Sequence, residues 1–294
     1  MGSLAPELPV IGREAERARL LANVARGRHT LLVGPIGAGK TCLLRHVAHA
    51  LPEAIYVPHL QPIRLGLLAT CEGLHARGQL ALANGTPAPE TWAECARLLG
   101  RVTVRELTAV AVASLRARPT VLILDQLDAA TPTMAPVIEA CLDAAVVLGA
   151  TRDCRPGLQK LWWAFERLDL PPLARDDART LLWTLVDRDR IPDVPLFEAT
   201  ILEQAAGNPH ALVDMARQVA GEGPVALEAI RGLQHGAGLR YLDLTPLLLL
   251  VAAGLVATRF VALGLDDRDL YILAGSLGAL FFVVRVVLMR KAGR

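Results

Sequence analysis

Hydrophobic positions in the first 235 residues form two alternating patterns. Short apolar runs at 29–33, 55–58, 120–125 and 144–150 predict strands, and the most continuous of them suit strands buried on both faces of a parallel sheet. Between them, apolar residues at helical spacing predict helices over 65–83 and 91–117, separated by a turn cluster at 84–89. Alternating strands and helices predict an α/β doubly wound parallel sheet.

The last fifty residues have a different pattern. Two stretches, 246–265 and 270–289, are each about twenty residues long and contain one charge apiece, Arg259 and Arg285. An apolar helix of that length spans about 30 Å, the thickness of a bilayer core. An acidic turn joins the stretches, and basic residues flank them at Arg240, Arg290, Lys291 and Arg294. This arrangement predicts a transmembrane hairpin with both chain ends in the cytoplasm; the alternative is a buried helical hairpin.

Composition adds a few limits. The chain has 294 residues, a hydrophobic content of 53%, a mean hydropathy of +0.38 and a net charge of only +2. The apolar excess is concentrated at the C-terminal end, and the small net charge gives no global sign of nucleic-acid binding. Five cysteines without C-x-x-C spacing argue against a disulfide framework and indicate a reducing compartment. No secretory signal is expected at 1–9.

The clearest chemical motif lies between a predicted strand and a predicted helix. Residues 34–41 fit the phosphate-loop pattern G-x-x-x-x-G-K-[ST]. Glycines allow the backbone to approach phosphate oxygens, while the following helix N-terminus attracts anions. Lys40 is expected to reach the β- and γ-phosphates of a nucleotide, and the Thr41 hydroxyl to hold Mg²⁺. The predicted nucleotide contacts here are Gly34, Pro35, Ile36, Gly37, Ala38, Gly39, Lys40, Thr41 and Cys42.

A carboxylate follows the apolar run at 120–124. Asp125 is placed at the end of this predicted strand, where it would hold Mg²⁺ through water together with Thr41. Metal binding by Cys42 and His46 is a weaker alternative, because no further Cys or His completes a four-ligand set.

Several motifs occur in the order found in AAA+ and STAND ATPases, which the chain resembles over residues 9–235. They are Gly12-Arg13-Glu14, the phosphate loop, the block at 124–128, the segment at 149–152, and Gly207-Asn208-Pro209 before a helix. The resemblance implies Mg²⁺ and ATP as cofactors, with an ATPase core at 1–172 and a helical lid at 173–238. The hydropathy pattern adds the transmembrane hairpin at 239–294. It further implies that Val10, Ile11 and Gly12 lie near adenine, that Arg152 senses the γ-phosphate and that Pro209 closes the lid.

One position departs from the family pattern. AAA+ enzymes usually place a glutamate after the aspartate at the end of this strand, whereas this chain has Gln126. An amide orients water but cannot accept its proton at neutral pH. The expected catalytic residues are Lys40, Asp125, Gln126 and Arg152. Because Gln126 replaces the usual glutamate, slow ATP hydrolysis is predicted. Asp128 is a possible substitute base.

The predicted function is a membrane-anchored, slowly hydrolysing ATP switch. The resemblance implies a homo-oligomer, a ring or a filament, in which an arginine of a neighbour completes the site; Arg155, Arg167 and Arg175 are the candidates. The lipid bilayer of the cytoplasmic membrane and an unidentified protein are expected partners.

Three alternatives stay open. One is an ATP-dependent DNA-binding regulator tethered to the membrane, for which a basic stripe of Arg97, Arg101 and Arg105 on the predicted helix 91–117 would supply phosphate contacts. Another is a defence effector that perturbs membranes. The last is an ATPase that assembles a secretion system.

Overall fold

The computed structural model describes residues 10–82, 86–219, 245–265, 268–269, 271–279 and 281. It divides into two compact units, Met1–Gly238 and Leu239–Arg294, and each is described by itself.

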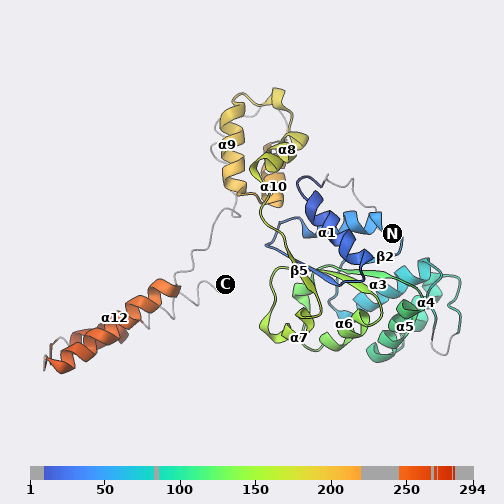
Figure 1. Cartoon of the computed structure of the whole chain (residues 1–294), viewed down its shortest axis with the longest axis horizontal. Helices are drawn as coiled ribbons and strands as arrows, with labels where there is room; N and C mark the ends of the chain where they lie inside the picture. The colour runs from blue at the N-terminus through green and yellow to red at the C-terminus, as the bar shows by residue number, and fades with distance from the viewer. Residues whose placement is uncertain are drawn as a thin grey trace. The chain divides into compact units, whose positions relative to one another are not determined.

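The first unit is built on a parallel sheet of five strands in the order β2-β3-β4-β1-β5 (Figure 1). Strand β4 lies between β1, which leads into the phosphate loop, and β3, which leads to Asp125. This sheet agrees with the α/β part of the predicted fold. The strands are β1 Thr30–Val33, β2 Ala54–Val57, β3 Val121–Leu124, β4 Val146–Thr151 and β5 Glu166–Asp169.

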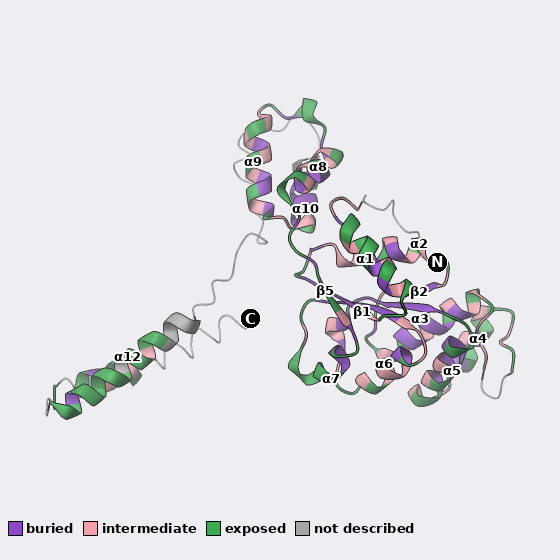
Figure 2. Ribbon diagram, in the orientation of Figure 1, coloured by how far each residue is buried: buried purple, intermediate pink, exposed green. Residues whose placement is uncertain are grey.

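Helices cover both faces of the sheet, because side chains of a strand alternate between its two sides. In β1, Leu31 and Val33 belong to one core with α3, α5, α6 and α7, whereas Leu32 belongs to another with α1 and α2. Buried residues accordingly gather on the strands and on the inner helix faces (Figure 2). The helices are α1 Glu14–Ala25, α2 Lys40–Ala50, α3 Ile63–Ala76, α4 Trp92–Leu99, α5 Val104–Ala117, α6 Ala135–Leu142 and α7 Gln159–Trp162, with short 3₁₀ turns η2 Leu127–Ala129 and η3 Pro156–Leu158.

The edge strand β5 was not among the predicted strands. Three of its four residues are charged, and only Leu168 is buried. An edge strand packs one face and leaves the other to solvent, so it gives no continuous apolar run. Its position is fixed by pairing with β1, in which Leu32 lies opposite Leu168.

The predicted helix 91–117 is interrupted. Helix α4 ends at Leu99, and α5 starts after Thr103, whose side chain and that of Glu106 form a capping box. This reciprocal pair satisfies backbone N–H groups at the start of a helix and therefore favours a new helix at this point. The predicted basic stripe is thus wrong as a single helix face, since Arg97 lies on α4, Arg101 between the helices and Arg105 on α5.

Three helices after the sheet form a small subdomain with its own apolar core, which we call the lid. Phe197, Ile201 and Leu212 are buried in it, and Asp193 caps one of its helices by accepting a hydrogen bond from Leu196 N. The lid consists of α8 Arg175–Leu185, η4 Arg188–Arg190, α9 Val194–Ala205 and α10 Pro209–Val219. The remainder of the predicted lid, 220–238, lies outside the described residues.

In the second unit, α12 runs from Thr245 to Gly264, and residues 271–279 are also helical. The guanidinium of Arg259 donates to Tyr271 Oη at 2.5 Å and lies 4.6 Å from the centre of its ring, so the two segments contact each other.

The prediction of two transmembrane helices, at 246–265 and 270–289, is wrong for the described part of the chain. No helix among those residues is long and apolar enough to cross a bilayer. A span requires about twenty apolar residues in one helix, but the second predicted span is described as continuous helix only over 271–279. Residues 282–289 lie outside the described part. The predicted cytoplasmic-membrane location, which rested on these spans, loses that support.

Candidate functional site

The phosphate loop connects the end of β1 to the start of α2. Gly37 and Gly39 have φ angles of +81° and +91°, a left-handed region that suits glycine and disfavours other residues. These turns bring the loop directly to the N-terminus of α2 at Lys40. Backbone N–H groups in the first turn of a helix have no intrahelical acceptor, so this end of α2 can bind an anion.

The Lys40 ammonium lies back over the loop. Its Nζ donates to the carbonyl oxygens of Gly34 at 2.7 Å and Pro35 at 2.8 Å. Burial lowers the pKa of Lys40, the carboxylates of Asp128 and Asp125 oppose that shift, and the charge of Arg152 adds to it. The charges that act on Lys40 thus come from Asp125 after β3, Asp128 in η2 and Arg152 after β4.

The lid is hydrogen-bonded to the same loop. Asn208 Nδ2 donates to Ile36 O at 2.9 Å, and the backbone N–H of His210 donates to Gly37 O at 3.2 Å. The contact is close, since a Cβ on Gly37 would lie 2.4 Å from Asn208 Oδ1. The start of α10 therefore lies directly against the phosphate loop.

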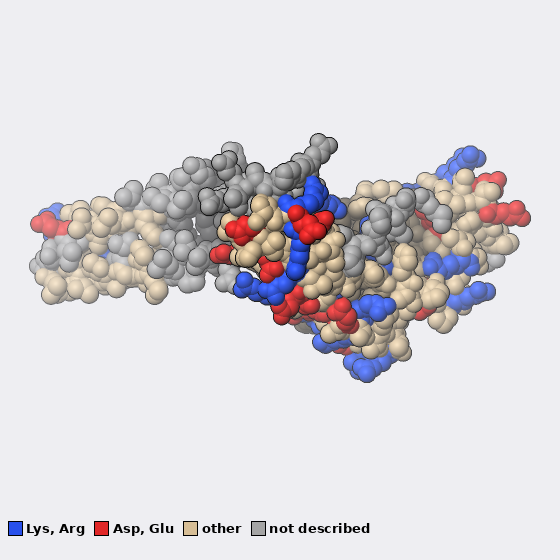
Figure 3. Space-filling model, turned by 90° about the horizontal axis from the view of Figure 1, so that it is seen from above, with Lys and Arg blue, Asp and Glu red and all other residues tan. Residues whose placement is uncertain are grey.

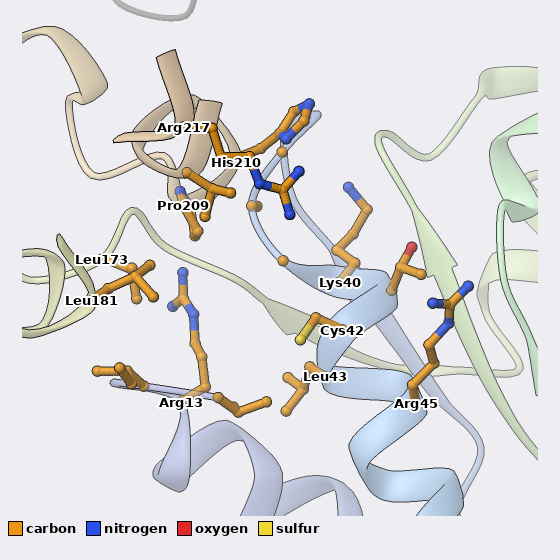
Figure 4. A pocket seen from close by; sticks show the side chains of 17 residues that line it. Arg13, Lys40, Cys42, Leu43, Arg45, Leu173, Leu181, Pro209, His210 and Arg217 are labelled. Carbon is orange, nitrogen blue, oxygen red and sulfur yellow. The ribbon is translucent and has the colours of Figure 1, made fainter. Parts of the chain in front are cut away.

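A cavity of about 530 Å³ lies between the core and the lid (Figure 4). Leu173 and Leu181 line it on one side and Lys40 on the other, while His210 and Arg217 enter it from α10 (Figure 4). Its volume is in the usual range for a small-molecule site. The lining residues are Val10, Ile11, Arg13, Gly37, Ala38, Gly39, Lys40, Thr41, Cys42, Leu43, Arg45, Leu173, Leu181, Pro209, His210, Val213 and Arg217.

Most predicted nucleotide contacts line this cavity. They are Val10, Ile11, Gly37, Ala38, Gly39, Lys40, Thr41, Cys42 and Pro209. Four others do not line it but shape its surroundings. Gly12 packs against the side chain of Asp177 with φ +68°, the carbonyls of Gly34 and Pro35 accept from Lys40, and the carbonyl of Ile36 accepts from the lid.

The cavity is also lined by residues that were not predicted to contact the nucleotide. Arg13 is 5% exposed and donates to Glu16 Oε1 and to Pro171 O, which joins the Gly12-Arg13-Glu14 motif to the segment before the lid. Val213 and Arg217 follow Pro209 at intervals of four on α10. The spacing of these residues could have predicted that they line the same site as Pro209, because residues four apart share one face of a helix.

Asp125 lies at the end of β3 and is 2% exposed. Its Oδ2 accepts a 2.8 Å hydrogen bond from Tyr56 Oη, and its Oδ1 accepts one of 2.9 Å from Gln126 N. Both carboxylate oxygens thus have fixed partners.

Gln126 has a left-handed backbone with φ +58° and lies at the start of η2. Left-handed backbone is costly for a residue with a side chain and often occurs at functional sites. Its side-chain Oε1 lies 3.1 Å from Nδ1 of His59, in the segment that follows β2. The side-chain amide of Gln126 is therefore held by the side chain of His59 and not by a strand of the sheet.

Arg152 follows directly after β4, and its Nε lies 3.9 Å from Asp153 Oδ2. It does not line the cavity, although its charge acts on Lys40. Of the arginines expected to act in a neighbouring copy, Arg155 and Arg175 are exposed, and Arg167 pairs with Asp169 at 2.7 Å. These roles stay predictions.

The residues present suit Mg²⁺ brought by a nucleotide more than a protein-built metal site. Nowhere in the described ranges do three or more His, Cys, Asp or Glu side chains cluster to hold a metal. Thr41 and Asp125 supply oxygen atoms, the ligand type that Mg²⁺ prefers, and Mg²⁺ usually binds through few protein ligands with waters and phosphates. This donor set fits the predicted metal.

The comparison with protein families agrees with this geometry, since residues 9–147 match the AAA ATPase domain family. Residues 9–147 therefore resemble an AAA+ P-loop ATPase domain. This domain contains the phosphate loop, the Gly12-Arg13-Glu14 motif and Asp125, and its family implies binding of ATP. No curated protein matches the chain.

Solved structures resemble the AAA+ domain in fold. The Walker-type ATPase of Pyrococcus abyssi has 14% identity and a TM-score of 0.51, with 90% of this chain and 80% of that chain covered. The Thermotoga maritima RuvB Holliday junction branch migration motor has 15% identity and a TM-score of 0.45, over 80% of this chain and 74% of that chain. The likeness to the Pyrococcus abyssi ATPase is one of fold.

Proposed function

We propose that the chain binds Mg²⁺-ATP in the cavity between the core and the lid and works as a nucleotide-dependent switch in a homo-oligomer. The main support for this proposal is that hydrogen bonds from Asn208 and His210 join the lid to the phosphate loop beside that cavity. Phosphates bound at the loop would therefore meet the start of α10 directly. Nucleotide state would change the position of the lid.

The apolar side of the cavity suits a purine base. Val10, Ile11, Leu173 and Leu181 present aliphatic surface, which favours a flat, poorly hydrated ring. On the phosphate side, Lys40 would leave the carbonyls of Gly34 and Pro35 for phosphate oxygens. Bound Mg²⁺ would neutralise phosphate charge, with Thr41 and Asp125 as its protein partners.

Slow hydrolysis follows from the residue after Asp125. Gln126 would orient an attacking water without removing its proton, because an amide is not a base at neutral pH. A switch that hydrolyses slowly remains long enough in its ATP state to assemble. Oligomer formation would then bring an arginine of one copy, such as Arg155 or Arg175, to the site of another.

For the described residues, the structure does not support the contacts on which the DNA alternative depended. Its basic stripe is divided between α4, a connection and α5. On the face shown in Figure 3, the basic and acidic side chains are interspersed and do not form one continuous basic field.

Binding of ATP and ADP to full-length protein, measured by calorimetric titration with Mg²⁺, tests the proposal. Wild type should bind both, and Lys40→Ala should weaken ATP binding at least about tenfold because it removes a charge-assisted contact. Sedimentation velocity with ATP, ADP and no nucleotide tests assembly. A chain that ignores ATP in the presence of Mg²⁺ would refute the proposal, and sedimentation that is identical in all three states would refute its switch.

A further inference from the structure

Tyr56 is a residue beside the proposed site to which neither the motifs nor the family comparison gives a role. It lies on β2, where Val57 pairs with Leu124 of β3, so its ring is one strand away from Asp125. Its hydroxyl donates to Asp125 Oδ2 at 2.8 Å. In this bond the phenol O–H of Tyr56 donates and the carboxylate oxygen of Asp125 accepts.

This hydrogen bond completes the fixation of the Asp125 carboxylate. With Gln126 N on Oδ1 and Tyr56 Oη on Oδ2, the group cannot rotate without losing a bond. Hydrogen bonds of this kind to a metal-binding carboxylate set its orientation and affect metal affinity strongly.

The ring of Tyr56 also has a partner that reaches the cavity. The Arg45 guanidinium carbon lies 5.7 Å from the ring centre, within the range of a cation–π contact. Arg45 belongs to α2 and lines the cavity on the same side as Lys40 (Figure 4). A continuous path of side chains thus runs from the cavity through Arg45 and Tyr56 to Asp125.

Resting on the proposed function, we propose that Tyr56 is a positioning residue for Asp125. It holds the carboxylate in the orientation that receives the Mg²⁺ accompanying ATP, and Arg45 joins it to the nucleotide cavity.

Measuring ATP affinity with saturating Mg²⁺ and with EDTA separates this role from a structural one. In Tyr56→Phe the ring and its packing remain and only the hydroxyl is lost. Affinity in EDTA should stay within about twofold of wild type, whereas the enhancement by Mg²⁺ should fall about tenfold. Tyr271→Phe, which removes a hydroxyl from the second unit, should leave both values unchanged.

The outcomes distinguish this inference from the proposed function. Wild type that binds no ATP in either condition refutes the proposed function. Wild type that binds ATP equally with and without Mg²⁺ overturns the role of Tyr56 alone, as does a Tyr56→Phe variant with the full Mg²⁺ enhancement. An equal loss of affinity in both conditions would show a structural role instead.

A double-mutant cycle tests the Arg45 part. Arg45→Met keeps the long side chain of an exposed helix position and removes the charge. If Arg45 acts through Tyr56, the effects of Arg45→Met and Tyr56→Phe on the Mg²⁺ enhancement should be less than additive. Additive effects would overturn the link between them. Both variants in this cycle are conservative, so their effects on the Mg²⁺ enhancement can be compared directly.

Discussion

The side-chain amide of Asn208 donates a 2.9 Å hydrogen bond to the carbonyl oxygen of Ile36, and so joins the lid to the phosphate loop. The Oδ1 atom of the same residue accepts from the N–H groups of His210 and Ala211, which caps the start of α10. One side chain therefore stabilises a helix end and fixes that end against the loop. The two roles can be separated by experiment.

Asn208→Ala should affect both stability and nucleotide binding. Loss of the cap should lower the free energy of unfolding by about 0.5–2 kcal/mol, as measured by urea denaturation. Loss of the bond to Ile36 should also weaken ATP binding several-fold, because the lid is no longer held at the loop. Calorimetric titration would measure this second effect.

Asp193→Ala is the matched control for Asn208→Ala. Asp193 caps α9 in the same lid by accepting from Leu196 N at 3.0 Å, and it does not line the cavity. Its loss should cost a similar unfolding free energy and leave ATP affinity unchanged. Equal ATP binding by the two variants would contradict a specific role for the contact between Asn208 and Ile36.

Gly37 and Gly27 provide a second matched pair. Both have a positive φ, but a Cβ on Gly37 would lie 2.4 Å from Asn208 Oδ1, whereas nothing lies within 4 Å of one on Gly27. Gly27→Ala should cost about 1–2 kcal/mol from left-handed backbone alone. Gly37→Ala should cost more and should reduce ATP binding. Similar results for both variants would show that the lid adapts without loss.

Gln126→Glu should accelerate ATP hydrolysis by about tenfold or more, since a positioned general base commonly contributes that much. The new carboxylate would retain an acceptor for His59, which holds the Gln126 side chain at 3.1 Å. Phosphate release at saturating ATP is the measurement, with Gln126→Ala as the control that should not accelerate it. A Gln126→Glu rate equal to wild type, at unchanged ATP affinity, would show that the missing carboxylate is not the limit.

Asp128 is the alternative base, and its charge acts on Lys40. If the chain hydrolyses ATP slowly for want of a base, Asp128→Asn should change the rate by less than about threefold. Loss of nearly all hydrolysis in Asp128→Asn would instead assign the proton-accepting role to this residue. The same phosphate assay distinguishes the two results.

Glu166 makes the stability of the core depend on pH. It accepts hydrogen bonds from Arg19 at 3.0 Å and Arg28 at 3.1 Å, and these lower its pKa from the ordinary 4.5 to about 2. Because the folded-state pKa is depressed, the stabilisation is complete above about pH 4.5 and is lost as the pH falls towards 2. The melting temperature of Glu166→Gln should therefore lie below wild type at pH 7, and the difference should shrink at pH 3. A difference that is constant over this range would contradict the ion-pair assignment.

The buried parts of the sheet were predictable because they depend on local pattern. The run at 120–125 and the loop at 34–41 combine apolar strands, glycines and a helix start, and each of these features is encoded by neighbouring residues. The run at 144–150 corresponds to β4 for the same reason. Strand β5 was not predicted because its stability comes from pairing with β1 and not from its own mostly charged residues.

The C-terminal hairpin shows the limit of hydropathy. The prediction of two membrane spans used length, apolar content and the basic flanks, but no helix in the described residues is long and apolar enough to cross a bilayer. The hydrogen bond between Arg259 and Tyr271 instead shows a polar contact between the two segments, twelve residues apart in the chain.

The sequence by itself determined the phosphate loop, Lys40, Thr41 and the carboxylate at the end of β3, since each depends on residues adjacent in the chain. The tertiary structure decided which distant groups meet them. Tyr56 reaches Asp125, Asn208 reaches Ile36, and Arg217 reaches the cavity only because β2 pairs with β3 and the lid folds against the loop. Contacts between residues tens to well over a hundred positions apart depend on packing of the whole unit, which no local pattern encodes.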